Sequence, residues 1–265
     1  MTIQIAILAK QVLDTEIPSD QFKINENGNN LETKGNNSPI INGFDLNATE
    51  AALKLRDDGH DVNITVIMAG DGFFLDIIKK PLSMGADNLV LLQDESLVGC
   101  GSTFTVKALS SVIDKIGPFD IILAGRHASD FDNGHVPIGI AETINLPIIT
   151  YASEIKIKNN HLMIKRITLN GYQIIETSFP CIITVSNEIG EPRYPNLRGI
   201  MTATKKNPKI FSFRDLGLDK QKEDLIQLER IFIPENNLNT EFITGEDESE
   251  IGRNLAIRLK EEGLI

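Results

Sequence analysis

The sequence contains few cysteines and no tryptophan. Its 265 residues include 2 cysteines, Cys100 and Cys181. They lie far apart and form no CxxC pair, which argues against a disulfide framework, a paired-cysteine metal site and a thiol redox motif. A low cysteine count is typical of a reducing compartment, so we expect a cytoplasmic protein.

Positive charge is also scarce. The formal net charge is −11 at pH 7 and the sequence pI is ≈ 4.9. Sequence-independent binding to nucleic acid or to an anionic membrane needs clustered cations. We therefore expect no nucleic-acid partner, and the short basic run KKNPK (205–209) is typical of a solvated turn.

Long apolar runs and common catalytic signatures are missing as well. No stretch approaches the ~20 apolar residues that cross a bilayer. The start MTIQIAILAKQV has no basic segment before its apolar part and breaks at Lys10, so it indicates a first strand and not a signal peptide, and we expect no membrane insertion. There is no Walker lysine, GxSxG, HExxH or kinase signature, which disfavours an ATPase, a hydrolase or a metalloprotease.

The first half of the chain alternates short apolar runs with helical patterns. Such alternation predicts an α/β fold with a doubly wound, mostly parallel sheet and helices on both faces. Within this pattern, Gly59 is placed to cap the first helix, and Pro81 predicts a kink or an early end of the second. The expected strands are 3–8, 62–69, 88–92 and 119–124, and the expected helices are 45–59, 73–85 and 103–117.

The remaining segments follow other patterns. Residues 16–43 are polar and asparagine-rich, and predict an excursion or hairpin between the first strand and the first helix. Residues 153–168 alternate with period two around an Asn-Asn turn, which indicates a second hairpin. We expect one α/β domain over 1–218, and a C-terminal arm with an amphipathic helix over 219–265.

Three polar loops follow strands, at 9–14, 69–72 and 125–136. Because ligands of open parallel sheets bind at the carboxyl ends of the strands, we expect these loops to meet at one edge. The third loop leads into a helix, which we expect Asn133 to cap, and Gly134 would let a phosphate approach the helix N-terminus. Its apolar stripe comprises Val136, Ile140, Ala141 and Ile144.

The residues of the third loop also allow a plainer interpretation. Loop aspartates and asparagines often satisfy turn backbones, and His127 and His135 can simply face solvent. Asp130 and Asp132 would make a poor divalent-cation site without further ligands. Spacing alone leaves a nucleotide site and a polar surface loop as open alternatives.

Several longer motifs occur in a characteristic order: KQV (10–12) with Asp14, NGFDLNATEAALKLRD (42–57), LSMGADN (82–88), DIILAGRHASDFDNGHVPIGIAE (120–142) and NEIGEPRYPNLRGIMTATKK (187–206). With these motifs, roughly the whole chain resembles the beta subunit of electron transfer flavoprotein. The resemblance implies a heterodimer whose alpha subunit holds most of the electron-carrying FAD. It implies that the beta chain binds an adenine nucleotide, which is a structural AMP in many members. In electron-bifurcating and nitrogen-fixation-linked members a second FAD takes that place and exchanges hydride with NADH.

The resemblance also implies which residues hold the nucleotide. The backbone N–H groups from Asn133 to Val136 would meet its phosphate. The cofactor-binding residues carried over by position are Ala9, Asn42, Ala69, Asp130, Asp132, Asn133, Gly134, His135 and Val136.

The same loop departs from the family pattern at some positions. Phe131 stands where FAD-carrying members usually have glycine, Pro137 replaces a glycine, and His135 replaces a glutamine. Val136 matches the FAD-carrying pattern better than the threonine of AMP-carrying members. On balance the resemblance favours FAD over AMP in this chain.

The segment 187–206 resembles the loop that docks partner dehydrogenases, of the acyl-CoA type or another flavin type. Leu197 stands at the position of the anchoring apolar side chain, although it could instead pack back on the sheet. We expect Arg193 to pair with a carboxylate in this loop or on the alpha subunit. Arg166, on a strand-like run, would reach toward the alpha-bound flavin, and residues 219–265 would contact the alpha subunit.

The resemblance implies an electron carrier that acts between a flavin dehydrogenase or NADH and a redox acceptor. No side chain need perform acid–base catalysis, because the protein positions a cofactor and tunes it. A nucleotide-binding sensor without a redox role is the alternative, and a purely structural partner with a degenerate pocket is a third possibility.

Overall fold

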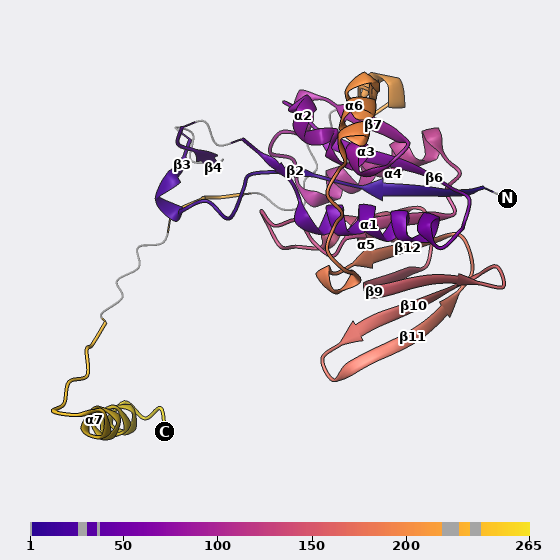
Figure 1. Ribbon diagram of the computed structural model, residues 1–265. Helices are drawn as coiled ribbons and strands as arrows, with labels where there is room; N and C mark the ends of the chain where they lie inside the picture. The colour runs from indigo at the N-terminus through magenta and orange to yellow at the C-terminus, as the bar shows by residue number, and fades with distance from the viewer. Residues whose placement is uncertain (1, 26–30, 36–37, 219–227, 234–239) are drawn as a thin grey trace. The chain divides into compact units, whose positions relative to one another are not determined.

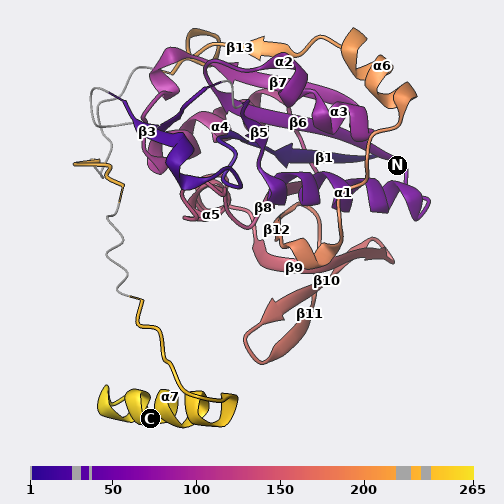
Figure 2. The same cartoon turned by 60° about the vertical axis from the view of Figure 1, so that its left-hand side comes forward.

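The described part of the chain builds a nine-stranded sheet in the order β11-β10-β9-β12-β8-β1-β6-β7-β13, and Figure 1 shows β9, β10 and β11 side by side beyond β12. The structure is a computed structural model that describes residues 2–25, 31–35, 38–218, 228–233 and 240–265. From β9 to β13 neighbouring strands are parallel, and β10 and β11 continue the β9 edge as antiparallel strands (Figure 2). The strands are β1 (Ile3–Leu8), β6 (Val62–Gly70), β7 (Asn88–Gln93), β8 (Ile121–Gly125), β9 (Ile148–Lys158), β10 (His161–Thr168), β11 (Gly171–Thr177), β12 (Cys181–Val185) and β13 (Lys209–Phe211).

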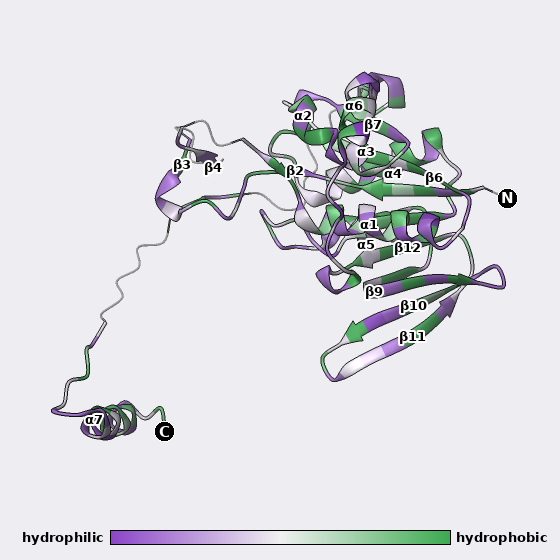
Figure 3. Ribbon diagram, viewed as in Figure 1, coloured by the Kyte–Doolittle hydropathy of each residue, from purple (hydrophilic) through white to green (hydrophobic). Residues whose placement is uncertain are grey.

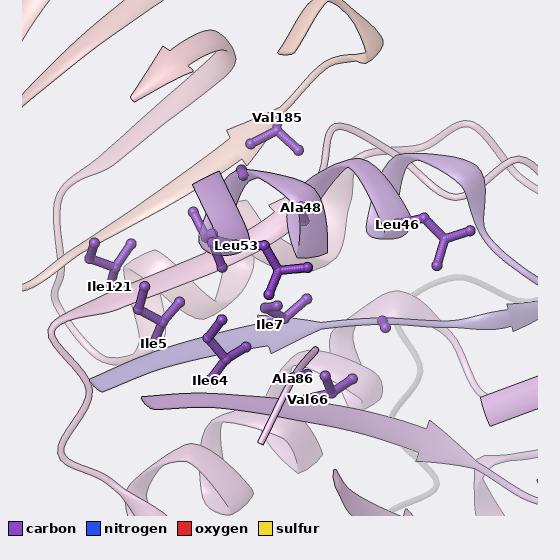
Figure 4. Packing of buried hydrophobic residues seen from close by; sticks show 14 of the residues in the cluster. Ile5, Ile7, Leu46, Ala48, Leu53, Ile64, Val66, Ala86, Ile121 and Val185 are labelled. Carbon is purple, nitrogen blue, oxygen red and sulfur yellow. The ribbon is translucent and has the colours of Figure 1, made fainter. Parts of the chain in front are cut away.

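The parallel strands are apolar because both faces of the sheet are covered. In β1, Ile5 and Ile7 pack into the cluster beneath α1 (Gly43–Asp57), and Ala6 and Leu8 pack into the opposite cluster beneath α4 (Ser102–Ile116). Figure 3 shows this as apolar colour along the central strands, and Figure 4 shows the α1 face from close by. The predicted doubly wound α/β fold is confirmed.

The helices follow the predicted pattern with one break. Helix α1 ends at Asp57, and Gly59 (φ +92°) follows with its N–H donating to the Arg56 carbonyl. The expected helix over 73–85 is divided, and Pro81 lies in the first turn of its second part. The other helices are α2 (Leu75–Ile78), α3 (Lys80–Met84), α5 (His135–Thr143), α6 (Leu197–Lys205) and α7 (Glu248–Glu261), with 3-10 helices η1 (Ser19–Gln21), η2 (Glu95–Leu97), η3 (Asn187–Ile189) and η4 (Arg214–Leu216).

Both expected hairpins are present. Strands β9 and β10 turn through Asn159 and Asn160, whose positive φ angles (+48° and +63°) suit an asparagine-rich two-residue turn. The excursion between the first strand and the first helix contains two small antiparallel pairs, and its residues 26–30 and 36–37 lie outside the described part. These pairs are β2 (Gln11–Val12) with β5 (Ile40–Ile41), and β3 (Phe22–Ile24) with β4 (Leu31–Thr33).

The chain divides into two units, residues 1–231 and 232–265. The second unit contains α7, which starts where the Asp247 side chain accepts a hydrogen bond from the Glu250 N–H. The domain boundary expected after residue 218 falls at residues 219–227, which lie outside the described part. None of the helices that the structure describes is long and apolar enough to span a bilayer.

The strand order of the sheet indicates at which edge a ligand is expected to bind. After β1 the chain adds β6 and β7 on one side, and then returns to add β8 on the other side of β1. The order therefore reverses between β1 and β8, and such switch points open a crevice at the carboxyl ends of their strands. The loops 9–14 and 125–136 leave β1 and β8 at this point.

Candidate functional site

Asp45, in the first turn of α1, joins the ends of the two switch-point strands. One carboxylate oxygen accepts the Lys10 N–H at 2.8 Å, and the other accepts the Gly125 N–H at 3.1 Å. The side chain is buried, and burial raises the pKa of Asp45 from 3.8 to about 7, although these hydrogen bonds act to lower it. Sequence reasoning missed Asp45. The sequence indicates it only as an acidic residue on the face of the predicted helix that is otherwise apolar.

Asn42, the fully buried residue before α1, fixes the third polar loop. Its amide nitrogen donates to the His127 carbonyl at 2.9 Å, and its amide oxygen accepts the Ser129 N–H at 3.2 Å. Its own backbone N–H donates to the Lys10 carbonyl at 2.9 Å. Asn42 thus holds the loops after β1 and β8 in one arrangement, and its role as a cofactor-binding residue stays a prediction.

The third loop enters α5 through Gly134, not through an Asn133 cap. Gly134 precedes His135 with φ +61°, in the left-handed region, and α5 starts at His135. The expected capping by Asn133 is therefore wrong, because the residue that flanks the helix is the glycine. A Cβ on Gly134 would lie 2.8 Å from the Arg126 carbonyl oxygen, so glycine is needed for close backbone packing as well as for φ.

The loop carboxylates are engaged by neighbouring cations or imidazole. The Lys10 ammonium lies 2.6 Å from Asp130, and the His127 ring nitrogen Nε2 lies 3.2 Å from Asp132. The two aspartates are thus used separately and do not converge on one point. Within the described residues, no group of three or more His, Cys, Asp and Glu side chains could hold a metal ion.

The first turn of α5 has the donors that a phosphate requires. The first backbone N–H groups of a helix lack intrahelical partners and carry the positive end of its dipole. Asn133 and His135 are exposed and Gly134 is half-buried, so this turn is accessible to a ligand. The His135 ring contacts Ser102 at 3.2 Å, and Val136 packs partly on the core beneath the helix. The residues present therefore fit a nucleotide phosphate.

Ala9 and Ala69 lie at the same edge of the sheet. Ala9 is buried directly after β1 and donates its N–H to the Ile67 carbonyl on β6. Ala69 is half-buried near the end of β6. Together with Asn42 and the loop 130–136, they occupy the carboxyl end of adjacent strands, as expected from the sequence.

Arg126, which sequence reasoning did not single out, is within cation–π range of two aromatic rings. Its guanidinium carbon lies 4.6 Å from the centroid of Phe44 and 5.9 Å from that of Tyr151. Its Nε is buried without a hydrogen-bond partner. Phe44 also packs edge-to-face against His127. In the sequence, Arg126 could have been noticed only as an arginine that directly follows a predicted apolar strand.

The segment 187–206 is fastened to α1 by Arg193. The Arg193 guanidinium pairs with Glu50 at 2.8 Å and 2.9 Å and with Asp57 at 2.6 Å. The prediction that its carboxylate partner lies in the loop or on another subunit is corrected, because both carboxylates belong to α1 of this chain. These partners raise the pKa of Arg193 well above its ordinary value.

Leu197 begins α6, after Asn196 caps the helix by accepting the Gly199 N–H at 2.8 Å. Leu197 is 74% exposed, which excludes the alternative that it packs back on the sheet. Ile200 and Met201 in the same helix are exposed as well. Helix α6 thus presents an accessible apolar surface.

Arg166 lies on β10, across from Ala152 on β9. Its Nη1 is 3.4 Å from the Gln173 amide oxygen, and its Nε is buried without a hydrogen-bond partner. The register aligns Ala152 with Val185, whose carbonyl accepts the Arg126 N–H. Arg166 therefore lies in the cross-strand row that leads through Ala152 and Val185 to Arg126, at the start of the third polar loop.

Comparison with known proteins agrees with the motifs. A family model described as the electron transfer flavoprotein domain matches residues 33–216. The caffeyl-CoA reductase-Etf complex subunit CarD of Acetobacterium woodii is 33% identical over 267 residues, which cover 99% of this chain and 100% of the relative. The electron transfer flavoprotein subunit beta of Megasphaera elsdenii is 32% identical over 259 residues, or 94% of each chain. That of Thermoanaerobacterium thermosaccharolyticum is 36% identical over 221 residues, or 83% of this chain and 82% of the relative.

Proposed function

The chain belongs to the electron transfer flavoprotein family, and on this premise we propose that it is the beta subunit of a heterodimeric electron transfer flavoprotein. In this role it binds an adenine nucleotide at the β1–β8 switch point. It passes electrons between a flavin dehydrogenase or NADH and a redox acceptor, in complex with an alpha subunit. We place it in the cytoplasm.

The observation that carries this proposal is the junction of two loops in front of α5. Asp45 and Asn42 hold the loops after β1 and β8 together, and Gly134 turns the chain into the α5 N-terminus. In the proposed complex the backbone N–H groups from Asn133 to Val136 bind phosphate. Asp130, Asp132 and Asn133 border the ligand along the loop, and Ala9 and Ala69 leave room for it at the sheet edge.

We propose FAD and not AMP as the nucleotide of this chain. FAD, when bound, supplies hydride and electron transfer, whereas AMP supplies neither. Val136 supports FAD as argued from the sequence, and the chain's own residues hold and orient the group. With FAD in this site, NADH would be a direct electron donor and electron bifurcation would become accessible to the complex.

The partner surfaces are proposed from three segments. Exposed Leu197, on the segment that Arg193 fastens to α1, supports docking of a flavin dehydrogenase. A relative named as part of a caffeyl-CoA reductase complex supports a dehydrogenase of the acyl-CoA type. We propose that the half-buried Arg166 places its guanidinium toward the alpha-bound flavin, and that the C-terminal segment 219–265 contacts the alpha subunit.

A nucleotide-binding sensor is not favoured. A sensor has no use for an exposed apolar helix anchored through a buried carboxylate, and the family to which the chain belongs transfers electrons. The two functions differ in the expected consequence of Leu197→Ala, which should slow electron exchange with a dehydrogenase and leave nucleotide binding intact.

Nucleotide content tests the proposal directly. The chain is coexpressed with its alpha subunit, the purified complex is denatured, and the released nucleotides are identified by chromatography. Two FAD per heterodimer without AMP would support the full proposal. One FAD with one AMP would keep the subunit assignment and reject FAD in this chain, and a chain that binds neither alpha subunit nor nucleotide would overturn the proposed function.

A further inference from the structure

Phe131 is a large apolar side chain directed outward from an otherwise polar loop. It is 63% exposed, and its neighbours are Asp130, Asp132 and Asn133. It contributes little to the core beneath α5, which is built from residues such as Ile140 and Ala141. Packing within this chain therefore does not account for an aromatic ring at this place.

The backbone holds this ring in a defined position. The N–H groups of Phe131 and Asp132 both donate to the Ala128 carbonyl, at 3.3 Å and 2.9 Å. Asp132 then turns the chain with φ +53°, and its carboxylate pairs with His127. Because this turn is hydrogen-bonded on both sides of the ring's attachment point, ligand binding does not have to order the backbone of Phe131.

A cation from the neighbouring loop adds to this arrangement. The Lys10 ammonium lies 5.2 Å from the centroid of the Phe131 ring, within cation–π range, and is held there by its 2.6 Å ion pair with Asp130. The ring therefore has a fixed cationic neighbour and still keeps most of its surface accessible. A flat, electron-rich or polarisable ring is the partner that such a surface binds well.

We propose that Phe131 is a stacking platform for an aromatic ring of the nucleotide whose phosphate binds at the α5 N-terminus. This inference rests on the proposed nucleotide site and adds to it the residue that recognises the ring. Stacking needs no particular hydrogen-bonding pattern, so the ring is either the adenine shared by AMP and FAD or the isoalloxazine of FAD. Lys10 acts as a positioning residue, because it holds Phe131 and not the ligand.

The absence of tryptophan from the chain provides a site-specific test. Phe131→Trp introduces a single tryptophan at the proposed platform. Tyr172→Trp introduces one at an equally exposed position (62%) on β11, four strands away from β8 in the same sheet. The full-length, nucleotide-stripped chain is titrated with AMP, with FAD and with inorganic phosphate, while tryptophan emission is recorded. We expect saturating AMP or FAD to quench the emission of Phe131→Trp, and inorganic phosphate to leave it unchanged. The emission of Tyr172→Trp should be much less sensitive to either nucleotide. Quenching by AMP identifies adenine. Because a flavin also quenches tryptophan by energy transfer, quenching by FAD alone identifies isoalloxazine only together with weaker FAD binding by Phe131→Leu.

Affinity measurements on the wild-type chain and two further variants complete the test. Phe131→Tyr should keep the affinity, whereas Phe131→Leu, which stays apolar but loses the ring, should weaken nucleotide binding about 5- to 150-fold, as expected for a lost stacking contact. Suppose that wild type and Phe131→Leu bind nucleotide equally well, and that nucleotide leaves the emission of Phe131→Trp unchanged. Only the stacking inference is then overturned. Loss of the alpha subunit from Phe131→Leu with unchanged nucleotide affinity would make the ring a subunit contact and also overturn it. If the wild-type chain binds no nucleotide, the proposed site fails together with the inference.

Discussion

The Arg193 guanidinium forms a two-point hydrogen bond with the Glu50 carboxylate, Nε to Oε2 at 2.8 Å and Nη2 to Oε1 at 2.9 Å. The Arg193 backbone N–H donates to the same carboxylate at 3.0 Å. Glu50 lies in the middle of α1, and the start of the same helix holds the loop 125–136 through Asn42 and Asp45. One helix therefore supports both the proposed nucleotide site and the proposed docking segment.

Removing Arg193 should destabilise the protein far more than removing its exposed partner Asp57. Arg193→Met leaves the Glu50 carboxylate buried without its cation, and breaking a buried pair in this way costs about 3 kcal/mol or more. The Glu50 side chain is 6% exposed and that of Asp57 is 57% exposed, so Asp57→Asn should cost less than about 1 kcal/mol. Urea unfolding of the two variants measures both losses, and equal losses would contradict the assignment of Glu50 as the principal partner.

Asp45 should make the folded protein less stable as the pH rises from about 4 to about 7. Its pKa is about 7 in the folded chain and 3.8 ordinarily, so in this range the folded state holds a proton that the unfolded state has released. The stabilisation is complete below pH 4 and lost above pH 7. Asp45→Asn cannot titrate, although its amide nitrogen would face a backbone N–H and lower stability at every pH.

The measurement is the unfolding free energy of wild type and Asp45→Asn at intervals from pH 4 to 8. The stability advantage of the wild type should shrink across the window and become constant above it. Subtracting the variant removes the contribution of groups that titrate in both proteins. Parallel curves for the two proteins would show that Asp45 does not titrate in this range.

Gly134 should be far less replaceable than Gly72, although both have left-handed backbones. Gly72 has φ +66° and open space where a Cβ would lie, so Gly72→Ala should cost only the conformational penalty, about 1 kcal/mol. Gly134→Ala adds a contact of 2.8 Å with the Arg126 carbonyl and must move the loop or the helix start. We expect a larger stability loss together with weaker nucleotide binding, measured by thermal unfolding and titration with FAD. Matching effects of the two substitutions would mean that the close backbone approach at Gly134 is unimportant.

The central strands and helices could be predicted from the sequence because their signals are local. The apolar run at 3–8 and the stop at Gly59 need no knowledge of distant residues. The Asn133 cap was predicted wrongly because asparagine and glycine compete for this position, and only the left-handed backbone of Gly134 decides it. The Arg193–Glu50 pair joins residues 143 positions apart, so neither end predicts the other. Asp45 was missed for a similar reason. It is buried because β1 and β8, which are distant in sequence, end side by side against the start of α1.

Leu197→Ala should leave stability nearly unchanged and weaken the interaction with a partner dehydrogenase. Because Leu197 is 74% exposed, truncation of its side chain removes little buried area and should change the unfolding free energy by less than about 0.5 kcal/mol. An apolar anchor at an interface can contribute about 2 kcal/mol, which corresponds to roughly a 30-fold rise in the KM for the flavoprotein at constant FAD content. Leu169→Ala, at a fully exposed leucine in the β10–β11 turn, is the matched control and should leave this KM unchanged. A KM that rises equally in both variants would point to general surface hydrophobicity, and an unchanged KM in Leu197→Ala would remove α6 from the docking surface.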